Sequence, residues 1–325
     1  MVTHTRRKAL QIIAGAGVAP VAWPVAAQEI YPSKVIRIVV PYPAGGSTDQ
    51  LARAISMPLS EMLGQPVIID NKPGAGGTLG ADFVAKQPAD GYTLLFGNSG
   101  PNATVSMMRK LPYDIRKDFR PLSGVVKVPL ILAVAADSPH KTVSEFVAWA
   151  RTQGTNLNYG STGIGGSSHL ANEHFNEMAG TKFVHIPYAG GAPLVTAFAG
   201  GQVQMAFVTG LDGTAMVQAK KIKYLAVASP ARTDVLPGLP AIAEDVPGYS
   251  AVVWFGMLAP RGVPDAIADR LSKAISAAVQ RPEIQQLFRS RSVEPWGSTP
   301  ESLAQTIEGE LTKWGPIIKK SGISI

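Results

Sequence analysis

The sequence of 325 residues contains no cysteine. This absence excludes disulfide frameworks, thiolate metal sites, a nucleophilic cysteine and a lipid-modified N-terminal cysteine. Charge is also sparse, because Asp, Glu, Lys and Arg make up 16% of the residues whereas 46% are hydrophobic. That balance excludes disordered, collagen-like and coiled-coil chains and is typical of an ordered globular protein. Any site in this protein must therefore act through oxygen and nitrogen atoms.

Basic residues are present in only a small excess. The formal net charge is +7, and Arg6, Arg7 and Lys8 carry part of it within residues 1–27, which contain no acid. Elsewhere Lys and Arg are scattered, whereas nucleic-acid surfaces concentrate them in runs interleaved with aromatic residues. We therefore expect no nucleic-acid partner, because a mild positive charge instead suits solubility or the attraction of small anions.

The N-terminal segment has the composition of an export signal. The basic residues 5–8 precede a nearly uncharged stretch, and small residues lie directly before Gln28, as a signal peptidase requires. Two prolines interrupt the apolar stretch, which is shorter than the roughly 20 residues of a membrane span. We predict a signal peptide over residues 1–27, cleaved near Ala27, with the twin-arginine and general secretion routes both open. The mature chain is expected to be a soluble exported protein.

Short apolar segments alternate with Gly-rich turns and amphipathic stretches along the mature chain. Strands are predicted at 35–40, 67–70, 92–96, 130–136, 157–159, 183–186, 203–208 and 224–228. Helices are predicted over 51–62 with an end at Gly64, from Thr78 and Thr142, and over 264–287 and 300–320. This alternation predicts an α/β fold with mainly parallel sheets. Because about 300 residues approach the limit for one core, we expect two lobes.

Two Gly-rich segments follow predicted strands, at residues 43–49 (PAGGSTD) and 160–169 (GSTGIGGSSH). Their glycines let a ligand approach the backbone, and the free N–H groups of a helix N-terminus favour an anion. A purely structural alternative is that Ser, Thr and Asp side chains in these segments are N-caps. The residues concerned are Ser47, Thr48, Asp49, Ser167 and Ser168. For Asp49 we favour a cap or a first-turn acid over contact with a ligand.

Signatures of enzymes and metal sites fail in this sequence. There is no GxxxxGK[ST] segment, residues 74–80 miss the dinucleotide-binding spacing by one position, and residues 97–100 lack the final glycine of a nucleophile elbow. His169 and His174 are five residues apart, which places them on different faces of a helix and prevents chelation. We expect no metal and no cofactor, and we expect His169 to pack near its own loop.

Five separated blocks of the sequence carry a family resemblance. They are residues 41–53 (PYPAGGSTDQLAR), 70–97, 157–175, 186–193 (IPYAGGAP) and 254–264 (WFGMLAPRGVP). In this order they closely resemble the extracytoplasmic substrate-binding proteins of tripartite tricarboxylate transporters, the Bug family, over essentially all of the mature chain. The resemblance implies a two-lobed periplasmic-binding-protein type II fold, in which two crossing hinge strands join α/β lobes that close on a small carboxylate.

The resemblance also implies lobe boundaries and ligand-binding residues. Lobe 1 would comprise residues 28–127 and 254–325, and lobe 2 residues 128–253. The implied ligand-binding residues are Tyr42, Ala44, Gly45, Gly46, Ser47, Thr48, Asp49, Asn98, Ser99, Ser161, Thr162, Gly163, Gly165, Ser168, His169, Tyr188, Gly190 and Gly191. Two departures from the family pattern, Ala189 in place of Lys and Gln204 in place of an acid, prevent a direct transfer of ligand identity.

The function implied by the resemblance is that of a periplasmic receptor and not of an enzyme. The protein would capture a di- or tricarboxylate, an amino acid or an aromatic acid, act as a monomer, and deliver its ligand to integral-membrane permease subunits. Two alternatives remain open. One is the ligand-binding component of a sensory system, with a membrane sensor as partner. The other is an exported enzyme that uses Asp49 and His169 as acid and base, for which no third orienting group is evident.

Overall fold

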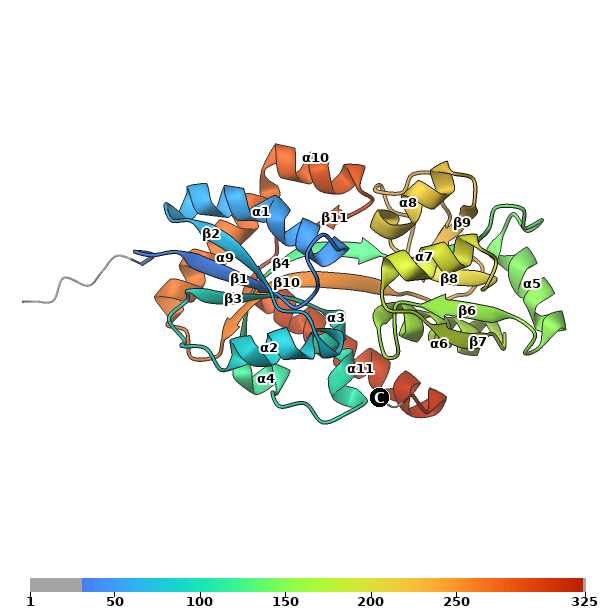
Figure 1. The fold of residues 1–325 in the computed structure, drawn as a ribbon, viewed down its shortest axis with the longest axis horizontal. Coiled ribbons are helices and arrows are strands. Elements are labelled where there is room, and N and C mark those ends of the chain that lie inside the picture. Colours follow the sequence, from blue (N-terminus) through green and yellow to red (C-terminus); the bar gives the residue numbers. More distant parts are fainter. Residues whose placement is uncertain (1–30, 324–325) are drawn as a thin grey trace, which may run out of the picture. The chain divides into compact units, whose positions relative to one another are not determined.

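The computed structural model describes residues 31–323, so the predicted signal peptide at residues 1–27 lies outside the described residues. The elements below belong to one compact unit, Pro32–Ile325. Within the described residues, the strands form two sheets, in the orders β11-β4-β10-β3-β1-β2 and β7-β6-β8-β5-β9. Figure 1 shows the first sheet in the left half of the view and the second in the right half.

The first sheet contains the two longest strands. Its members are β1 (Ile36–Val40), β2 (Val67–Asn71), β3 (Thr93–Asn98), β4 (Phe119–Pro129), β10 (Val252–Pro260) and β11 (Glu294–Pro295). β1 pairs in parallel with β2 and β3, whereas β10 pairs antiparallel with β3 and β4. The apolar sequence of β1 explains its interior position, because Ile36, Ile38 and Val39 are fully buried in a sheet covered on both faces.

The second sheet has the same parallel core. Its members are β5 (Ile131–Ala135), β6 (Asn158–Ser161), β7 (Val184–Pro187), β8 (Met205–Val208) and β9 (Ile222–Val227). β6 pairs in parallel with β7 and β8, and β5 pairs antiparallel with β8 and β9. The parallel pairing expected from the sequence is therefore found among the strands that alternate with helices, which are β1 to β3 and β6 to β8. The antiparallel pairs come from β4, β5, β9, β10 and β11, so each sheet is mixed.

Helices and short 3-10 turns fill the connections. They are α1 (Ser47–Leu63), η1 (Ala75–Gly77), α2 (Thr78–Ala85), α3 (Ser99–Asn102), η2 (Thr104–Met107), α4 (Ile115–Asp118), α5 (Val143–Gln153), α6 (Ser167–Ala179), α7 (Gly191–Ala199), α8 (Gly210–Gln218), η3 (Ile242–Glu244), α9 (Asp265–Gln280), α10 (Pro282–Ser290) and α11 (Pro300–Ser321). As predicted, α1 ends at Gly64 in the left-handed conformation, and the Thr142 hydroxyl caps α5. Among the described residues, no helix combines the length and apolar character needed to cross a membrane.

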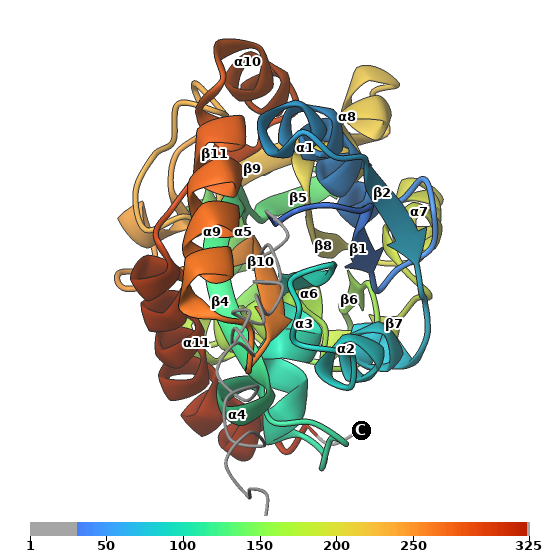
Figure 2. The same cartoon turned by 90° about the vertical axis from the view of Figure 1, so that its left-hand side faces the viewer.

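The strand order explains where a ligand can bind. In the first sheet β1 lies between β2 and β3, and α1 and α2 lie on opposite sides of β1 (Figure 2). Right-handed connections that run in opposite directions produce this arrangement and leave a crevice at the carboxyl ends of β1 and β3. In the second sheet β6 lies between β7 and β8 in the same way, so a second crevice is expected there.

β4 and β10 connect the two sheets. β4 continues through Leu130 into β5, and β10 returns beside it in the antiparallel sense (Figure 1). At the crossing, Leu130 N–H donates to the Ala251 carbonyl at 3.4 Å, and Ala228 N–H donates to the Leu130 carbonyl at 2.7 Å. The expected α/β fold with two sheets and two crossing strands is confirmed. The sequence does not predict β4 as a strand, because Gly and Pro residues interrupt its apolar pattern.

One prediction concerns the packing of Gly124 in β4. A Cβ atom at this position would overlap the ring of Trp296, whose segment also receives a hydrogen bond from Gly124 N–H to the Ser298 hydroxyl, at 2.8 Å. We expect Gly124→Ala to lower the free energy of unfolding by about 1–3 kcal/mol, the usual cost of overpacking. Chemical denaturation measures the change.

The matched control for this substitution is Gly309→Ala in α11. Apart from its chain neighbours and the backbone of its own helix, no atom of the described residues lies within 4 Å of a Cβ added at Gly309. The same chemical change should therefore raise the free energy of unfolding by about 0.5–1 kcal/mol, through higher helix propensity. Equal stability of the Gly124→Ala variant and the wild type would contradict the packing described for Trp296.

Candidate functional site

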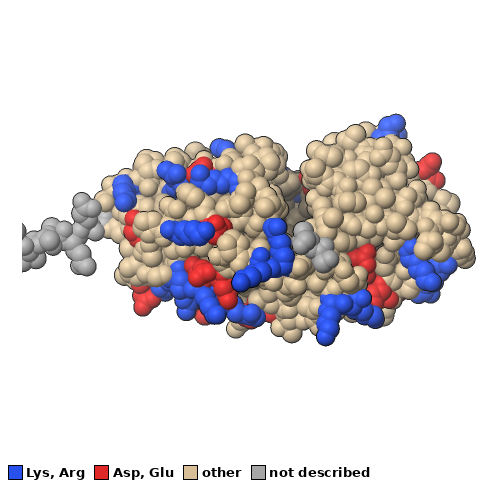
Figure 3. Space-filling view, turned by 60° about the horizontal axis from the view of Figure 1, so that its bottom comes forward, with Lys and Arg blue, Asp and Glu red and all other residues tan. Residues whose placement is uncertain are grey.

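A cavity of about 260 Å³ lies where the carboxyl ends of the parallel strands in the two sheets face each other. Figure 3 shows the molecule hollowed between its left-hand and right-hand parts. One wall contains Tyr42 after β1 and Asn98 at the end of β3, and the other contains Thr162 after β6 and Thr209 after β8. Small-molecule pockets typically measure roughly 300–1,000 Å³, so this cavity suits a small ligand.

The predicted site residues divide into two groups. Eight of them line the cavity: Tyr42, Ser47, Thr48, Asn98, Thr162, Gly163, Ser168 and Gly191. The other ten lie outside its lining, in the same loops or directly behind them: Ala44, Gly45, Gly46, Asp49, Ser99, Ser161, Gly165, His169, Tyr188 and Gly190. Both Gly-rich segments therefore contribute to one cavity, although residues 43–49 and 160–169 are far apart in the sequence.

Helices α1, α6 and α7 begin at this cavity, and each has a glycine at its N-cap position. The glycines are Gly46, Gly166 and Gly190, and the first helical residue of each helix lines the cavity. Because glycine has no side chain to cap a helix, the first N–H groups and the positive end of the helix dipole are left for a ligand or water. The N-cap alternative for the Ser, Thr and Asp residues of the two loops is therefore wrong.

Hydroxyl and amide side chains fix the backbone on both sides of the cavity. The Tyr42 hydroxyl donates to Oδ1 of Asn98 at 3.3 Å, and the same oxygen accepts a hydrogen bond from Gly100 N–H at 3.1 Å. Burial raises the pKa of Tyr42, so this phenol remains a donor. On the opposite side the Ser168 hydroxyl accepts a hydrogen bond from Thr162 N–H at 2.9 Å. These bonds keep the loops in place before any ligand arrives.

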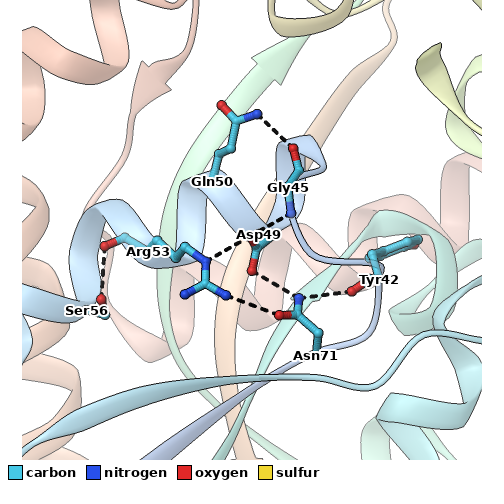
Figure 4. Close-up of polar contacts among 7 residues, drawn as sticks. All are labelled: Tyr42, Gly45, Asp49, Gln50, Arg53, Ser56 and Asn71. Atoms are coloured by element: carbon cyan, nitrogen blue, oxygen red, sulfur yellow. Dashed lines mark hydrogen bonds and ion pairs between the residues drawn. The ribbon is translucent and has the colours of Figure 1, made fainter.

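Asp49 lies behind the first loop and holds it in place. Its carboxylate accepts hydrogen bonds from Gly45 N–H at 2.9 Å, from Nε of Arg53 at 2.9 Å and from Nδ2 of Asn71 at 3.0 Å (Figure 4). Asn71 also donates to the Tyr42 carbonyl at 3.0 Å. Burial alone would raise the pKa of Asp49, but the bonds from Arg53, Gly45 and Asn71 outweigh it and leave the pKa below its ordinary value. The expected first-turn acid is thus a positioning residue.

His169 supports the second loop in a similar way. Its Nδ1 accepts a hydrogen bond from Gly165 N–H at 2.9 Å, and its ring stacks on His185 with 3.8 Å between the ring centroids. Nε2 of His185 lies 2.6 Å from the Ser161 hydroxyl. Burial, followed by the proximity of His185, lowers the pKa of His169 to about 4, so its ring is neutral near pH 7. His169 therefore packs near its own loop, as the sequence predicts.

The charge of the cavity is low and of one sign. Among the described residues that line it, only Asp212 carries a formal charge at neutral pH. The Ser47 hydroxyl of α1 donates to Oδ1 of Asp212 in α8 at 3.2 Å, between residues 165 apart in the sequence. Within the described lining no Lys, Arg or His is available to pair with an anion. An anion bound here would therefore depend on backbone N–H groups and hydroxyls.

Comparison with known proteins identifies the family. The family profile described as Tripartite tricarboxylate transporter family receptor matches residues 51–323. The chain belongs to this family. Among solved structures the receptor is similar to R. palustris Rpa4515 with adipate, at a TM-score of 0.83 and 35% identity over 90% of this chain and 99% of that chain. It is similar to the periplasmic binding protein BugD, at a TM-score of 0.79 and 32% identity over 90% and 99%.

A further similar structure is MatC from Rhodopseudomonas palustris with bound malate. The TM-score is 0.78 and the identity 30%, over 89% of this chain and all of that chain. These similarities confirm the family resemblance that the five sequence blocks indicate. They also confirm the α/β fold of a periplasmic solute-binding receptor.

Sequence reasoning missed part of the receptor's cavity. Ile164, Gly166 and Ser167 also line the cavity and belong to the predicted anion-favouring segment 160–169, and the position of Phe255 beside a glycine makes it a candidate for the wall of a cleft. The missed residues are Gly76, Gly100, Val105, Leu130, Leu194, Val195, Phe207, Val208, Thr209, Asp212 and Val253. Many are apolar and come from strand ends, where a sequence pattern does not separate cavity lining from core. The sequence does contain a signal that could have located Asp212. Thr209 and Asp212 form a capping-box pattern, which predicts a helix N-terminus directly after the strand 203–208.

The first prediction from the site is that Asp49→Asn destabilises the receptor. An asparagine offers one amide N–H₂ where the carboxylate accepts only, so at least one of the three donors around it loses its partner. We expect the free energy of unfolding to fall by about 1–3 kcal/mol. Chemical denaturation measures this, with Asp269→Asn on the exposed surface of α9 as the control. A variant with wild-type stability would contradict the positioning role of Asp49.

The second prediction concerns acid stability. Between its ordinary pKa of 6.5 and about 4, His169 takes up a proton in the unfolded chain but not in the folded receptor. The free energy of unfolding therefore falls as the pH is lowered through this range, by up to about 1.4 kcal/mol per pH unit for this residue. We expect His169→Gln to remove this contribution, so that its stability falls less steeply than that of the wild type. Parallel stability curves from pH 7 to pH 4.5 would contradict the low pKa.

Proposed function

We propose that this receptor captures a small organic carboxylate in the cavity between its two sheets. The observation that carries the proposal is the convergence of the N-termini of α1, α6 and α7 on one cavity that also contains hydroxyl side chains. Such donors suit an anion that must later be released, and bridging waters add contacts at a cost of roughly 0–2 kcal/mol each. The adipate on Rpa4515 and the malate on MatC support a carboxylate as the ligand class.

Closure of two lobes around the ligand follows from this proposal. We propose residues 28–127 with 254–325 as one lobe and 128–253 as the other, which move about the crossing strands β4 and β10. Only contacts that exist in the closed form and are absent from the open form shift this equilibrium. We propose the hydrogen bond between Ser47 and Asp212 as such a contact, because it joins α1 of the proposed first lobe to α8 of the proposed second lobe.

The remaining steps of uptake extend the proposal beyond the cavity. We propose that the signal peptide at residues 1–27 directs the receptor to the periplasm, a compartment supported by the similarity to the periplasmic binding protein BugD. As a monomer, the closed form would deliver its carboxylate to integral-membrane permease subunits. A membrane sensor is the alternative recipient and would recognise the same closed form.

The exported-enzyme alternative loses support from the positions of Asp49 and His169. Their exposed fractions are 2% and 5%, and both residues lie outside the lining of the cavity. Each side chain already bonds to the backbone of its own loop. Neither is placed to exchange a proton with a bound carboxylate, because a general acid or base must come within hydrogen-bond reach of its substrate. We therefore propose binding without catalysis.

A thermal-shift screen of the purified receptor against organic acids and amino acids tests carboxylate capture. A ligand that binds only the folded form stabilises it by RT ln(1 + [L]/Kd), about 2.7 kcal/mol at a hundredfold excess over Kd. We expect specific stabilisation by at least one carboxylate, which remains chemically unchanged after prolonged incubation. Stabilisation by none of them would contradict the proposal, and consumption of the acid would favour an enzyme.

The Gly166→Val variant tests whether the carboxylate binds in this cavity. Gly166 lines it at the start of α6, has an ordinary negative φ, and a Cβ there would meet its nearest atom at 3.3 Å. The valine side chain should therefore obstruct the ligand, weaken binding at least about tenfold and leave the fold intact. Gly200→Val at the end of α7 is the matched control, with a nearest atom at 3.4 Å and a position outside the lining. Equal binding by both variants would contradict the assigned cavity.

A further inference from the structure

The charge in the cavity indicates a narrower ligand class, an inference that rests on the proposed function. Asp212 is half-buried and is the one formally charged side chain among the described lining residues. An acid in a cavity proposed for a carboxylate would repel the ligand, because like charges at short range destabilise each other. The position of Asp212 therefore requires either a purely structural role or a ligand that also carries positive charge.

Neighbouring residues orient the Asp212 carboxylate toward the space between the sheets. The Thr209 hydroxyl accepts a hydrogen bond from Asp212 N–H at 3.1 Å and donates to Oδ2 at 2.7 Å. Ser47, on the opposite side of the cavity, donates to Oδ1 at 3.2 Å. A Cβ atom at Gly191 would lie 2.6 Å from Cγ of Asp212, so the glycine that begins α7 makes room for this carboxylate. The acid thus lies beside the N-termini of α1 and α7.

Because of these contacts, only part of the cavity is free to bind the carboxylate of a ligand. Ser47 at the N-terminus of α1 donates to Asp212, and Gly191 at the N-terminus of α7 lies against its carboxylate. Within the described residues, none of the hydrogen bonds of Asp212 involves α6, whose N-terminus also lines the cavity. A carboxylate has about four acceptor sites, and the hydroxyls of Ser47 and Thr209 fill two of them. Asp212 can therefore accept hydrogen bonds from a ligand. An ammonium group fits best, because it donates and also neutralises the charge.

The rest of the lining suits a hydrocarbon group. Phe207, Val253 and Phe255 line the cavity from β8 and β10, and Leu194 lines it from α7. We propose that the receptor binds an α-amino acid with an apolar side chain. Its carboxylate lies at the N-terminus of α6, its ammonium group at Asp212, and its side chain against Phe207 and Phe255. Asp212 is then the residue that selects this zwitterion over a dicarboxylate.

Isothermal titration calorimetry on the purified receptor tests this with ligand pairs that differ only in the ammonium group. The pairs are L-valine and 3-methylbutanoate, L-leucine and 4-methylpentanoate, and L-phenylalanine and 3-phenylpropanoate, with adipate as the dicarboxylate. A site built to bond a polar group rejects the analogue that lacks it. We expect at least one amino acid to bind about tenfold or more tightly than its partner and than adipate.

Asp212→Asn then separates a selective role from a structural one. In this variant we expect the amino acid and its deaminated partner to bind with nearly equal dissociation constants, and we expect adipate to bind more tightly than to the wild type. A purely structural role of Asp212 would instead weaken all ligands together. Asp234→Asn, at an exposed position of the same half of the chain, is the control and should keep the wild-type ratio.

The outcomes distinguish this inference from the proposed function. If no carboxylate binds the wild type, carboxylate capture itself fails. If adipate or the deaminated acids bind the wild type as tightly as the amino acids do, the assignment of Asp212 is overturned while carboxylate capture stands. The comparison of these affinities uses the wild-type receptor alone. It therefore still decides the question if the Asp212→Asn variant does not fold.

Discussion

The interaction on which the site depends is the exposure of backbone N–H groups at helix N-termini that face each other across the cavity. Strand order produces this exposure, because β1 and β6 each lie between two parallel neighbours in their own sheet, so that the loops after these strands lie at the carboxyl edge of each sheet. The glycines Gly46 and Gly166 at the N-caps leave these N–H groups free of side-chain caps. A glycine in place of a capping Ser, Thr, Asp or Asn costs only about a few tenths of a kcal/mol, so a stable fold tolerates it.

Polar groups that do not line the cavity hold its loops in position. Asp49 accepts three hydrogen bonds behind the first loop, and His169 accepts one from the backbone of the second. Both side chains are almost fully buried, so their bonds are protected from water and fix the loop geometry before a ligand binds. Preorganisation of this kind lowers the ordering cost of binding. It also explains why typical acid–base residues can be essential to a site without performing chemistry.

Much of the fold could be predicted from the sequence, and less of the site. Apolar runs located the strands of both parallel cores, and the helix boundaries at Gly64 and Thr142 followed from local signals. β4 escaped prediction because it contains Gly and Pro, which a long strand tolerates here between β10 and β11. The cavity combines Ser47 with Asp212, and no local pattern shows that two residues 165 positions apart share a hydrogen bond.

The central claim is that helix N-termini from both halves of the chain form the cavity that binds an organic acid. A crystal structure of the receptor with its bound ligand tests this most directly. The account predicts an organic acid between residues 47–49 and 167–169, with carboxylate oxygens about 2.7–3.2 Å from backbone N–H groups or bridged to them by water. An acid bound elsewhere, or one whose carboxylate is held by a Lys or Arg side chain, would contradict the account.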